Sequence, residues 1–320
     1  MGMRFAYFMP QSSSTSPFWS LKGSLVLTAI SVVYLVVSYL LVGFNSDQLA
    51  LTGLVNGLYY GSVISRKFLI AFSIFAVYWI IFDYMKAFPN YLYNSVHIES
   101  LYQLERNLFG ITQGQVLLTP NEFWLVHRTA FLDVLTGLFY LTWVPVPMMF
   151  AAYLFFKDQS TYYSFAFTFL LVNLIGFVIY YAYPAAPPWY IHEHGFNFYP
   201  HTPGNTAGLA NFDRYFGVSV FHSIYAKSSN VFAAMPSLHS SYPVIVVYHS
   251  VRKKMGLINV FFIVVMLGVW FSAVYSSHHY VLDVLAGLTC ALTGIGLFGL
   301  LQQTSWLKSL IGRMRSLTAF

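Results

Sequence analysis

The chain has 320 residues, of which 58% are hydrophobic, 20% are aromatic and only 8% are charged. A soluble domain would carry about 25% charged residues, so the composition excludes an ordinary soluble protein and indicates one that lies in a bilayer. The net charge of +6 comes from basic residues in short clusters between apolar runs. This pattern fits the loops of a membrane protein and argues against a nucleic-acid partner.

Apolar runs long enough to cross about 30 Å of hydrocarbon, which takes roughly 20 residues, follow one another along the chain. A weaker run, 49–65, carries Asn56 and three glycines and is either a full span or a re-entrant segment. We expect a single all-α, polytopic membrane domain over residues 1–320 with about eight spans. The seven stronger runs cover residues 24–44, 68–88, 130–156, 161–183, 234–251, 257–276 and 281–303.

The basic clusters orient these spans, because Lys and Arg concentrate in cytoplasmic loops. If 49–65 counts as a span, the clusters share one side and both termini are cytoplasmic. Two long segments, roughly 89–129 and 184–233, then lie on the non-cytoplasmic face. Residues 1–130 would hold the N-terminal spans and the first of these segments, and 131–303 the catalytic core. The clusters are Arg66-Lys67, Lys157, Arg252-Lys253-Lys254 and the tail residues Lys308, Arg313 and Arg315.

A first histidine motif opens the run 234–251, and its sequence is Met235-Pro236-Ser237-Leu238-His239-Ser240-Ser241. Pro236 and Ser237 are typical of a helix start, where Ser237 can cap free backbone N–H groups. Such an N-terminus also binds phosphate well. The alternative is an ordinary interfacial cap with a solvated His239.

A second motif opens the run 281–303, and its sequence is His278-His279-Tyr280-Val281-Leu282-Asp283. The spacing of four puts His279 and Asp283 on one helix face, where the carboxylate can orient the imidazole and stabilise its charged form. Alternatively, the pair only staples one helical turn. Both motifs begin their spans on the same non-cytoplasmic face, and ionisable groups at membrane depth mark functional sites. The two motifs together predict a membrane enzyme that uses two histidines.

The two motifs resemble the second and third signature motifs of the type 2 phosphatidic acid phosphatase superfamily, whose third motif has the form Ser-Arg-x5-His-x3-Asp. Within it, the chain is most similar to the inositol phosphorylceramide synthase branch. The resemblance covers roughly residues 180–290 and only loosely the first half. It also rests on the stretches Pro184-Ala185-Ala186-Pro187-Pro188-Trp189-Tyr190 and Ala207-Gly208-Leu209-Ala210-Asn211-Phe212-Asp213-Arg214-Tyr215-Phe216-Gly217.

The resemblance implies a six-helix phosphatase-like core behind extra N-terminal spans, and a phosphohistidine mechanism without metal or other cofactor. In the family's terms, His279 attacks the phosphorus of a phospholipid and Asp283 orients it. His239 protonates the departing alcohol and then deprotonates the incoming one. A neutral imidazole suits both roles near pH 7. The expected lipid substrates are a phosphatidylinositol-like donor and a ceramide-like acceptor, with diacylglycerol released.

The chain departs from the superfamily at two cations. Ala273 follows Ser272 where the third motif has Arg, and no Lys-x6-Arg-Pro motif occurs. Arg214, Lys227 and Arg128 are the candidates to balance the phosphate charge, with Arg214 favoured because it lies in a family-like stretch. Arg214 could equally be a solvated cation or pair with Asp213.

Other residues near the motifs have plainer interpretations. Trp189 and Tyr190 are interfacial anchors or flank a lipid access path, and we include them with Ser237 among the candidate substrate-binding residues. The loop histidines match no zinc-ligand spacing and have no cysteine beside them, so no metal site is expected. These histidines are His192, His194, His201 and His222.

The sequence therefore predicts an integral membrane phosphotransferase that moves a phosphoinositol-type head group between lipids at the non-cytoplasmic leaflet. A bacterial inner membrane with a periplasmic site is favoured, and a Golgi lumenal site would apply in a eukaryote. A phosphatase of the same fold, with water as acceptor, is the closest alternative. A proton-coupled transporter is a further one, although the two halves show no repeat symmetry.

Overall fold

The computed structural model describes residues 20–226 and 230–320. The described residues form two compact units, which divide between Leu69 and Ile70 and are described separately. In the described part, helices account for nearly all regular structure, so the all-α prediction is confirmed. The one departure is a short antiparallel hairpin of β1 (Ile111–Gln113) and β2 (Val116–Leu118), whose turn contains Gly114 at φ +63°.

In the first unit, α1 (Leu21–Val42) packs against α2 (Ser46–Gly61), and α3 (Val63–Tyr84) begins at its end. Asn45 caps α2 in a reciprocal arrangement with Gln48, which satisfies backbone groups at the helix start. Asn56, the polar residue that weakens the run 49–65, donates to the Ser31 hydroxyl of α1 at 3.0 Å. An interhelical hydrogen bond therefore satisfies this amide inside an apolar helix pair.

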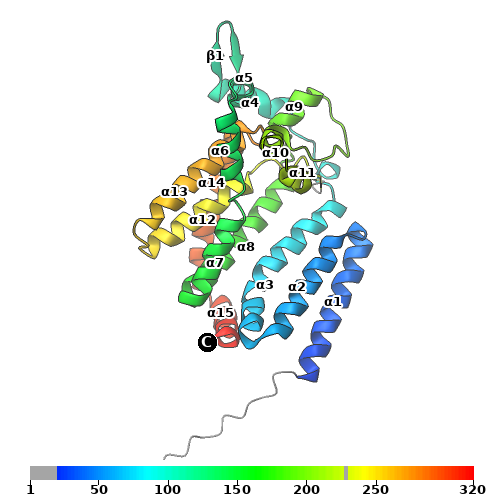
Figure 1. Cartoon of the computed structure of the whole chain (residues 1–320), viewed down its shortest axis with the longest axis vertical. Coiled ribbons are helices and arrows are strands. Elements are labelled where there is room, and N and C mark those ends of the chain that lie inside the picture. The colour runs from blue at the N-terminus through cyan, green and yellow to red at the C-terminus, as the bar shows by residue number, and fades with distance from the viewer. Residues whose placement is uncertain (1–19, 227–229) are drawn as a thin grey trace, which may run out of the picture. The chain divides into compact units, whose positions relative to one another are not determined.

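The second unit is a helical bundle (Figure 1). In its centre α12 packs against α8, α13 and α14, with α7 also in contact. After α14 the chain continues into α15, which packs against α8. The helices of the bundle are α6 (Ala130–Tyr140), α7 (Pro145–Lys157), α8 (Gln159–Ala182), α12 (Leu238–Arg252), α13 (Ile258–Tyr275), α14 (Val281–Leu301) and α15 (Ser305–Thr318).

Six helical segments among the described residues are long and apolar enough to cross a membrane, as expected for a polytopic membrane protein. They are Leu21–Val42, Val63–Ala87, Ala130–Lys157, Gln159–Ala182, Ile258–Tyr275 and Val281–Leu301. The two other predicted spans form the helices α2 and α12, which have only 16 and 15 residues. Both are shorter than the roughly 20 residues that a full crossing takes.

The expected span 130–156 is not one continuous helix. It breaks after Tyr140 and resumes as α7 at Pro145. Pro145 and Pro147 have no backbone N–H, so they suit the first turn of a new helix, where those N–H groups would have no intrahelical partner. The break matters because it places Tyr140 and Trp143 beside the histidine motifs.

Short helices from the two long connecting segments gather at the end of the bundle where α12 and α14 begin (Figure 1). Asn90 ties the two segments together, because its amide donates to the carbonyls of Tyr180 and Phe232 at 2.8 and 2.9 Å. These elements form a cover over one end of the bundle. They are η1 (Met85–Ala87), η2 (Asn90–Leu92), α4 (Glu99–Phe109), α5 (Pro120–Val126), α9 (Pro188–His194), η3 (Ala207–Leu209), α10 (Ala210–Phe216) and α11 (Val220–Tyr225).

Candidate active site

The two motif histidines meet beneath this cover. His239, in the first turn of α12, and His279, just before α14, approach with Nδ1 of His239 3.2 Å from Nε2 of His279. His279 is only 6% exposed. Because the rings share this contact, the nitrogens available for chemistry face each other from separate helices.

Asp283 lies on the other side of His279. Its Oδ2 is 3.5 Å from Nδ1 of His279, within ion-pair range but without hydrogen-bond geometry. The same Oδ2 accepts the backbone N–H of Tyr280 at 2.8 Å, and Asp283 has no exposed surface. The carboxylate therefore faces Nδ1, which leaves Nε2 as the reactive nitrogen, as in a His–Asp pair that activates or orients a nucleophile.

Burial also governs the charge of the histidine loop between α13 and α14. It lowers the pKa of His279 to about 4 and that of His278 to about 3. Both rings are therefore neutral near pH 7. A neutral imidazole has the free lone pair that a nucleophile needs.

The backbone around His279 is held by neighbouring helices. The carbonyl of Ala273 accepts the N–H groups of both His278 and His279, at 3.1 and 3.0 Å. The Asn121 amide, from α5, donates to the carbonyls of His279 at 2.9 Å and Val274 at 2.8 Å. Ala273, which stands where the superfamily has Arg, is fully buried in an apolar cluster. This position therefore anchors the loop through its backbone.

The first motif is fastened directly to the second. The N–H of Ser237 donates to the carbonyl of Asp283 at 2.9 Å, and the Ser241 hydroxyl donates to the carbonyl of Gly287 at 2.7 Å. A Cβ on Gly287 would clash with the carbonyl oxygen of Ser237. The approach of the two helix starts therefore depends on a glycine, as in closely packed membrane helices.

Ser237 stands at the N-cap position of α12, but its hydroxyl does not form the expected cap. The hydroxyl instead accepts a hydrogen bond from Ser240 at 3.0 Å, and Ser237 is fully buried. Its carbonyl accepts the N–H groups of Ser240 and Ser241. Its proposed contact with phosphate stays a prediction.

Aromatic rings enclose the histidine pair. The Tyr140 hydroxyl lies 3.4 Å from Nδ1 of His239 and accepts a hydrogen bond from Tyr225 at 3.2 Å. Trp143 packs edge-on against His239 with ring centroids 4.3 Å apart, and Tyr225 stacks on His278 at 4.3 Å. These side chains come from the α6–α7 break and from α11. Sequence reasoning missed them because no local pattern links those segments to the motifs.

Glu105 is a second residue that sequence reasoning missed. It lies on α4 with no exposed surface, and its two carboxylate oxygens accept the N–H groups of Val281 and Leu282 at 2.9 and 3.1 Å. It thus satisfies the first amides of α14, two residues after His279. Burial is the largest effect on this carboxyl and raises its pKa to about 7, although the two N–H groups act in the opposite direction.

The raised pKa of Glu105 predicts a pH-dependent contribution to stability. The folded protein holds this proton more tightly than the unfolded chain, whose carboxyl has a pKa of 4.5. The contribution is therefore fully present below about pH 4.5 and is lost as pH rises through about 7. We expect the difference in Tm between the unaltered protein and Glu105→Gln to fall by several degrees from pH 5 to pH 8 in detergent. Glu99→Gln, at an exposed position on the same helix, should show no such change, and a constant difference for Glu105→Gln would contradict the prediction.

Among the other predicted site residues, Trp189 is joined to the histidine loop through its backbone N–H, which donates to the carbonyl of Ser277 at 3.0 Å. Trp189 and Tyr190 are buried in an apolar cluster, and the Tyr190 hydroxyl donates to the carbonyl of Asn197. Arg214 is exposed on α10 and donates to Asn211 at 3.3 Å, while the Asp213 carboxylate accepts backbone N–H groups of α11. Lys227 lies outside the described residues. The substrate contacts of all four stay predictions.

Arg128 lies near the start of the histidine loop, next to Gly208 and Tyr275. A Cβ on Gly208 would clash with Nη2 of Arg128, and the same glycine donates its N–H to the carbonyl of Ser276 at 2.9 Å. The guanidinium carbon lies 5.9 Å from the centre of the Tyr275 ring, and the buried Nε has no hydrogen-bond partner. A donor nitrogen is thus left unsatisfied near residues that lead directly into His278 and His279.

Comparisons with known proteins find similar chains in a bacterium and in two fungi. A phosphoinositol dihydroceramide synthase of Bacteroides thetaiotaomicron is 45% identical over 277 residues, which cover 86% of this chain and 91% of the relative. The inositol phosphorylceramide synthase of Candida albicans is 31% identical over 62% of this chain and 41% of its own length. The catalytic subunit of the Saccharomyces cerevisiae enzyme is 30% identical over 62% of this chain and 49% of its own length.

No solved structure matches the chain. The sequence model of the PAP2 superfamily, however, matches residues 99–297, which include both histidine motifs and every element of the cover from α4 onward. Since that match extends over more than half of the 320 residues, the chain belongs to the PAP2 superfamily.

Proposed function

We propose that the chain is an inositol phosphorylceramide synthase-like phosphotransferase. It moves a phosphoinositol head group from a glycerophospholipid to ceramide or dihydroceramide and releases diacylglycerol. The names of the relatives support these substrates. The contact between His239 and His279, with Asp283 behind the second ring, is the observation that carries the reaction.

In the first half-reaction, Nε2 of His279 attacks the phosphorus and the bond from phosphorus to the diacylglycerol oxygen breaks. His239, in its protonated form, gives its proton to that oxygen, so diacylglycerol leaves as a neutral alcohol. His279 then carries the phosphoinositol group as a phosphohistidine, and Asp283 stabilises the positive charge on its ring.

In the second half-reaction, His239 takes the proton from the ceramide hydroxyl while the ceramide oxygen attacks phosphorus. The bond between phosphorus and Nε2 breaks, which returns both rings to their starting states. Because the rings touch at 3.2 Å, they must separate to admit the phosphoryl group. The buried aromatic surround supports transfer to a lipid alcohol, since it keeps competing water from the intermediate.

In this proposal the reaction takes place on the non-cytoplasmic face of the membrane. The basic clusters that mark the cytoplasmic side include Lys157 and Arg252–Lys254, at the C-terminal ends of α7 and α12. His239 lies at the opposite end of α12. Positive-inside orientation therefore supports an active site at the outer leaflet.

A lipid transfer assay tests the proposal. The purified chain is incubated with inositol-labelled phosphatidylinositol, with and without ceramide. We expect a labelled sphingolipid together with diacylglycerol, both dependent on ceramide. Release of inositol phosphate at the same rate without ceramide, and no new lipid, would instead identify a phosphatase.

Arg128 is proposed as the cation that holds the phosphate during transfer. Replacing it with glutamine removes a charge-assisted donor, and a loss of about 100-fold in kcat/KM is expected from a hydrogen bond of this kind. Arg214→Gln, at an exposed position, is the matched control and should change kcat/KM less than about 3-fold. The opposite order of effects would transfer the role to Arg214.

A further inference from the structure

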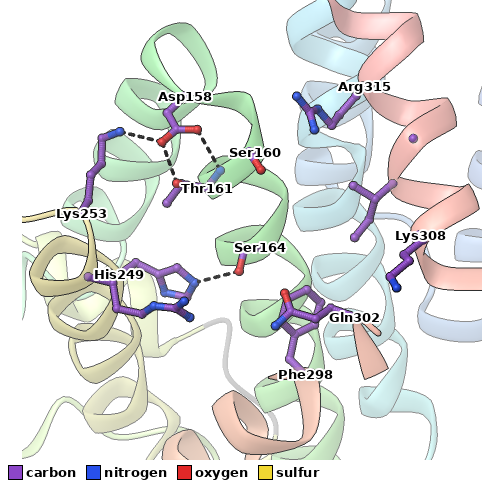
Figure 2. Close-up of a pocket in the computed structure, with 13 residues that line it drawn as sticks. Asp158, Ser160, Thr161, Ser164, His249, Lys253, Phe298, Gln302, Lys308 and Arg315 are labelled. Atoms are coloured by element: carbon purple, nitrogen blue, oxygen red, sulfur yellow. Dashed lines mark hydrogen bonds and ion pairs between the residues drawn. The ribbon is translucent and has the colours of Figure 1, made fainter. Parts of the chain in front are cut away.

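A polar cavity lies at the end of the bundle away from the histidine pair, and Figure 2 shows the residues that line it. It has a volume of about 580 Å³ and is lined by residues from the ends of α8, α12 and α14 and from one face of α15. His249, which lines it, is ten residues after His239 on α12, which corresponds to about 15 Å along the helix. The cavity is therefore distinct from the histidine pair.

The cavity is strongly basic. Four cations line it, Arg252, Lys253, Lys308 and Arg315, and the sole carboxylate in the lining is Asp158. Lys253 donates to Asp158 at 2.7 Å, and Thr161 donates to the same carboxylate.

The Asp158 carboxylate is already paired with Lys253 and Thr161. Desolvation alone would raise its pKa, but the hydrogen bonds from Lys253 and Thr161 outweigh this and lower the pKa to about 2. No carboxylate among the described residues lies within ion-pair distance of Arg252, Lys308 or Arg315. An anion in the cavity would therefore meet three uncompensated cations.

The helix α15, which forms one wall of the cavity, has the features of a helix at the bilayer surface. Lys308 and Arg315 each lie three to four residues from the adjacent pair Ile311 and Gly312, so all four line the cavity from one side of α15, and Figure 2 shows the two cations there. Trp306 and Leu317 lie outside that lining and are 59% and 61% exposed. A helix with basic and exposed apolar sides is typical of the bilayer surface.

Two contacts of Thr318 hold α15 against α8. The Gln159 amide donates to the Thr318 carbonyl at 2.8 Å, and the Tyr163 and Thr318 hydroxyls are 2.7 Å apart. The basic face is therefore fixed toward the start of α8, where Ser160 lines the same space and the Ser164 hydroxyl donates to Nε2 of His249 at 3.4 Å.

We propose that this cavity binds the phosphate of an anionic phospholipid head group from the cytoplasmic leaflet, at a site separate from catalysis. Basic pockets between helices on that side of a membrane suit such head groups. A soluble phosphate would use the same cations, but the exposed Trp306 and Leu317 on the opposite face of α15 favour a position of this helix at the bilayer surface, where a lipid head group is the available phosphate.

Lipid retention tests the site without relying on the transfer reaction. The full chain is reconstituted in nanodiscs with phosphatidylcholine alone or with added phosphatidylglycerol, and retained lipids are counted by native mass spectrometry after extraction. Removing two cations in Lys308→Gln/Arg315→Gln should weaken phosphatidylglycerol retention about 25-fold, at about 5-fold for each charge. Arg313→Gln, on the same helix but outside the cavity lining, should retain the lipid as the unaltered protein does.

The other possible outcomes either support or overturn the proposed lipid site. Unchanged Tm and unchanged basal transfer in the double variant would show that the loss is local, and Arg252→Gln provides an independent variant of the same site. Equal retention by the double variant, or equal retention of phosphatidylcholine, would overturn the proposal. Tight binding of inorganic phosphate to lipid-free protein, with no preference for phosphatidylglycerol, would assign the cavity to a soluble anion instead.

Discussion

Replacing His279 with glutamine is expected to reduce head-group transfer by about 10⁴-fold or more. Glutamine keeps a polar side chain of similar size but has no lone pair that can attack phosphorus. Loss of a covalent nucleophile leaves only the contribution of substrate binding and of the remaining polar groups. The measurement is the initial rate of labelled sphingolipid formation, together with a denaturing quench at alkaline pH to detect a base-stable phosphoenzyme.

The unaltered protein should give that phosphoenzyme and His279→Gln should not. His222→Gln, at an exposed position on α11, is the control and should keep normal rates. If the His279→Gln protein still transfers the head group at more than about one-hundredth of the normal rate, His279 is not the nucleophile, and the proposed reaction fails with it.

Replacing His239 with glutamine should reduce transfer from phosphatidylinositol by up to about 10⁴-fold, the upper range for one general acid–base group. The size of this rate reduction in His239→Gln should depend on the leaving group. Diacylglycerol departs as a poor leaving group that needs a proton, whereas nitrophenolate departs without one. With a nitrophenyl phosphoinositol donor, we therefore expect formation of the phosphoenzyme to recover to within about 10-fold of the normal rate.

The same nitrophenyl donor separates the two histidines. His279→Gln should remain inactive with it, because the missing step is attack on phosphorus and not protonation. An equal loss for both donors in His239→Gln would mean that His239 only positions its neighbour. The short contact between the two rings, 3.2 Å, makes this control necessary.

Some features of the site were predictable because they are local. The spacing of four between His279 and Asp283 fixes their relation wherever a helix begins near Tyr280, and the structure places the carboxylate behind the ring. The all-α membrane fold followed from the length and apolar character of the runs. By contrast, the break at Pro145 was missed, because the run 130–156 was interpreted by its apolar length alone, although Pro145 and Pro147 favour the start of a new helix.

The contributions of distant segments were not predictable. Glu105 and Asn121 lie more than 150 residues before the loop that they hold, and nothing near them in sequence marks them as buried. Arg214 was favoured over Arg128 because it lies in a family-like stretch, yet Arg128 is the one packed beside Gly208 and the histidine loop. The similarity of one stretch of sequence to the family therefore did not indicate which cation the fold would place near the histidine loop.

The sequence by itself determined the membrane class, the helical architecture and the identity of the two histidines, since hydropathy and short-range spacing act within one helix or loop. Only the tertiary structure decided that the rings touch, which polar groups satisfy the loop that carries His279, and where unpaired cations collect. These depend on close approach between segments far apart in the chain. Burial then sets the energetic value of each polar group, and burial is a property of the packed bundle.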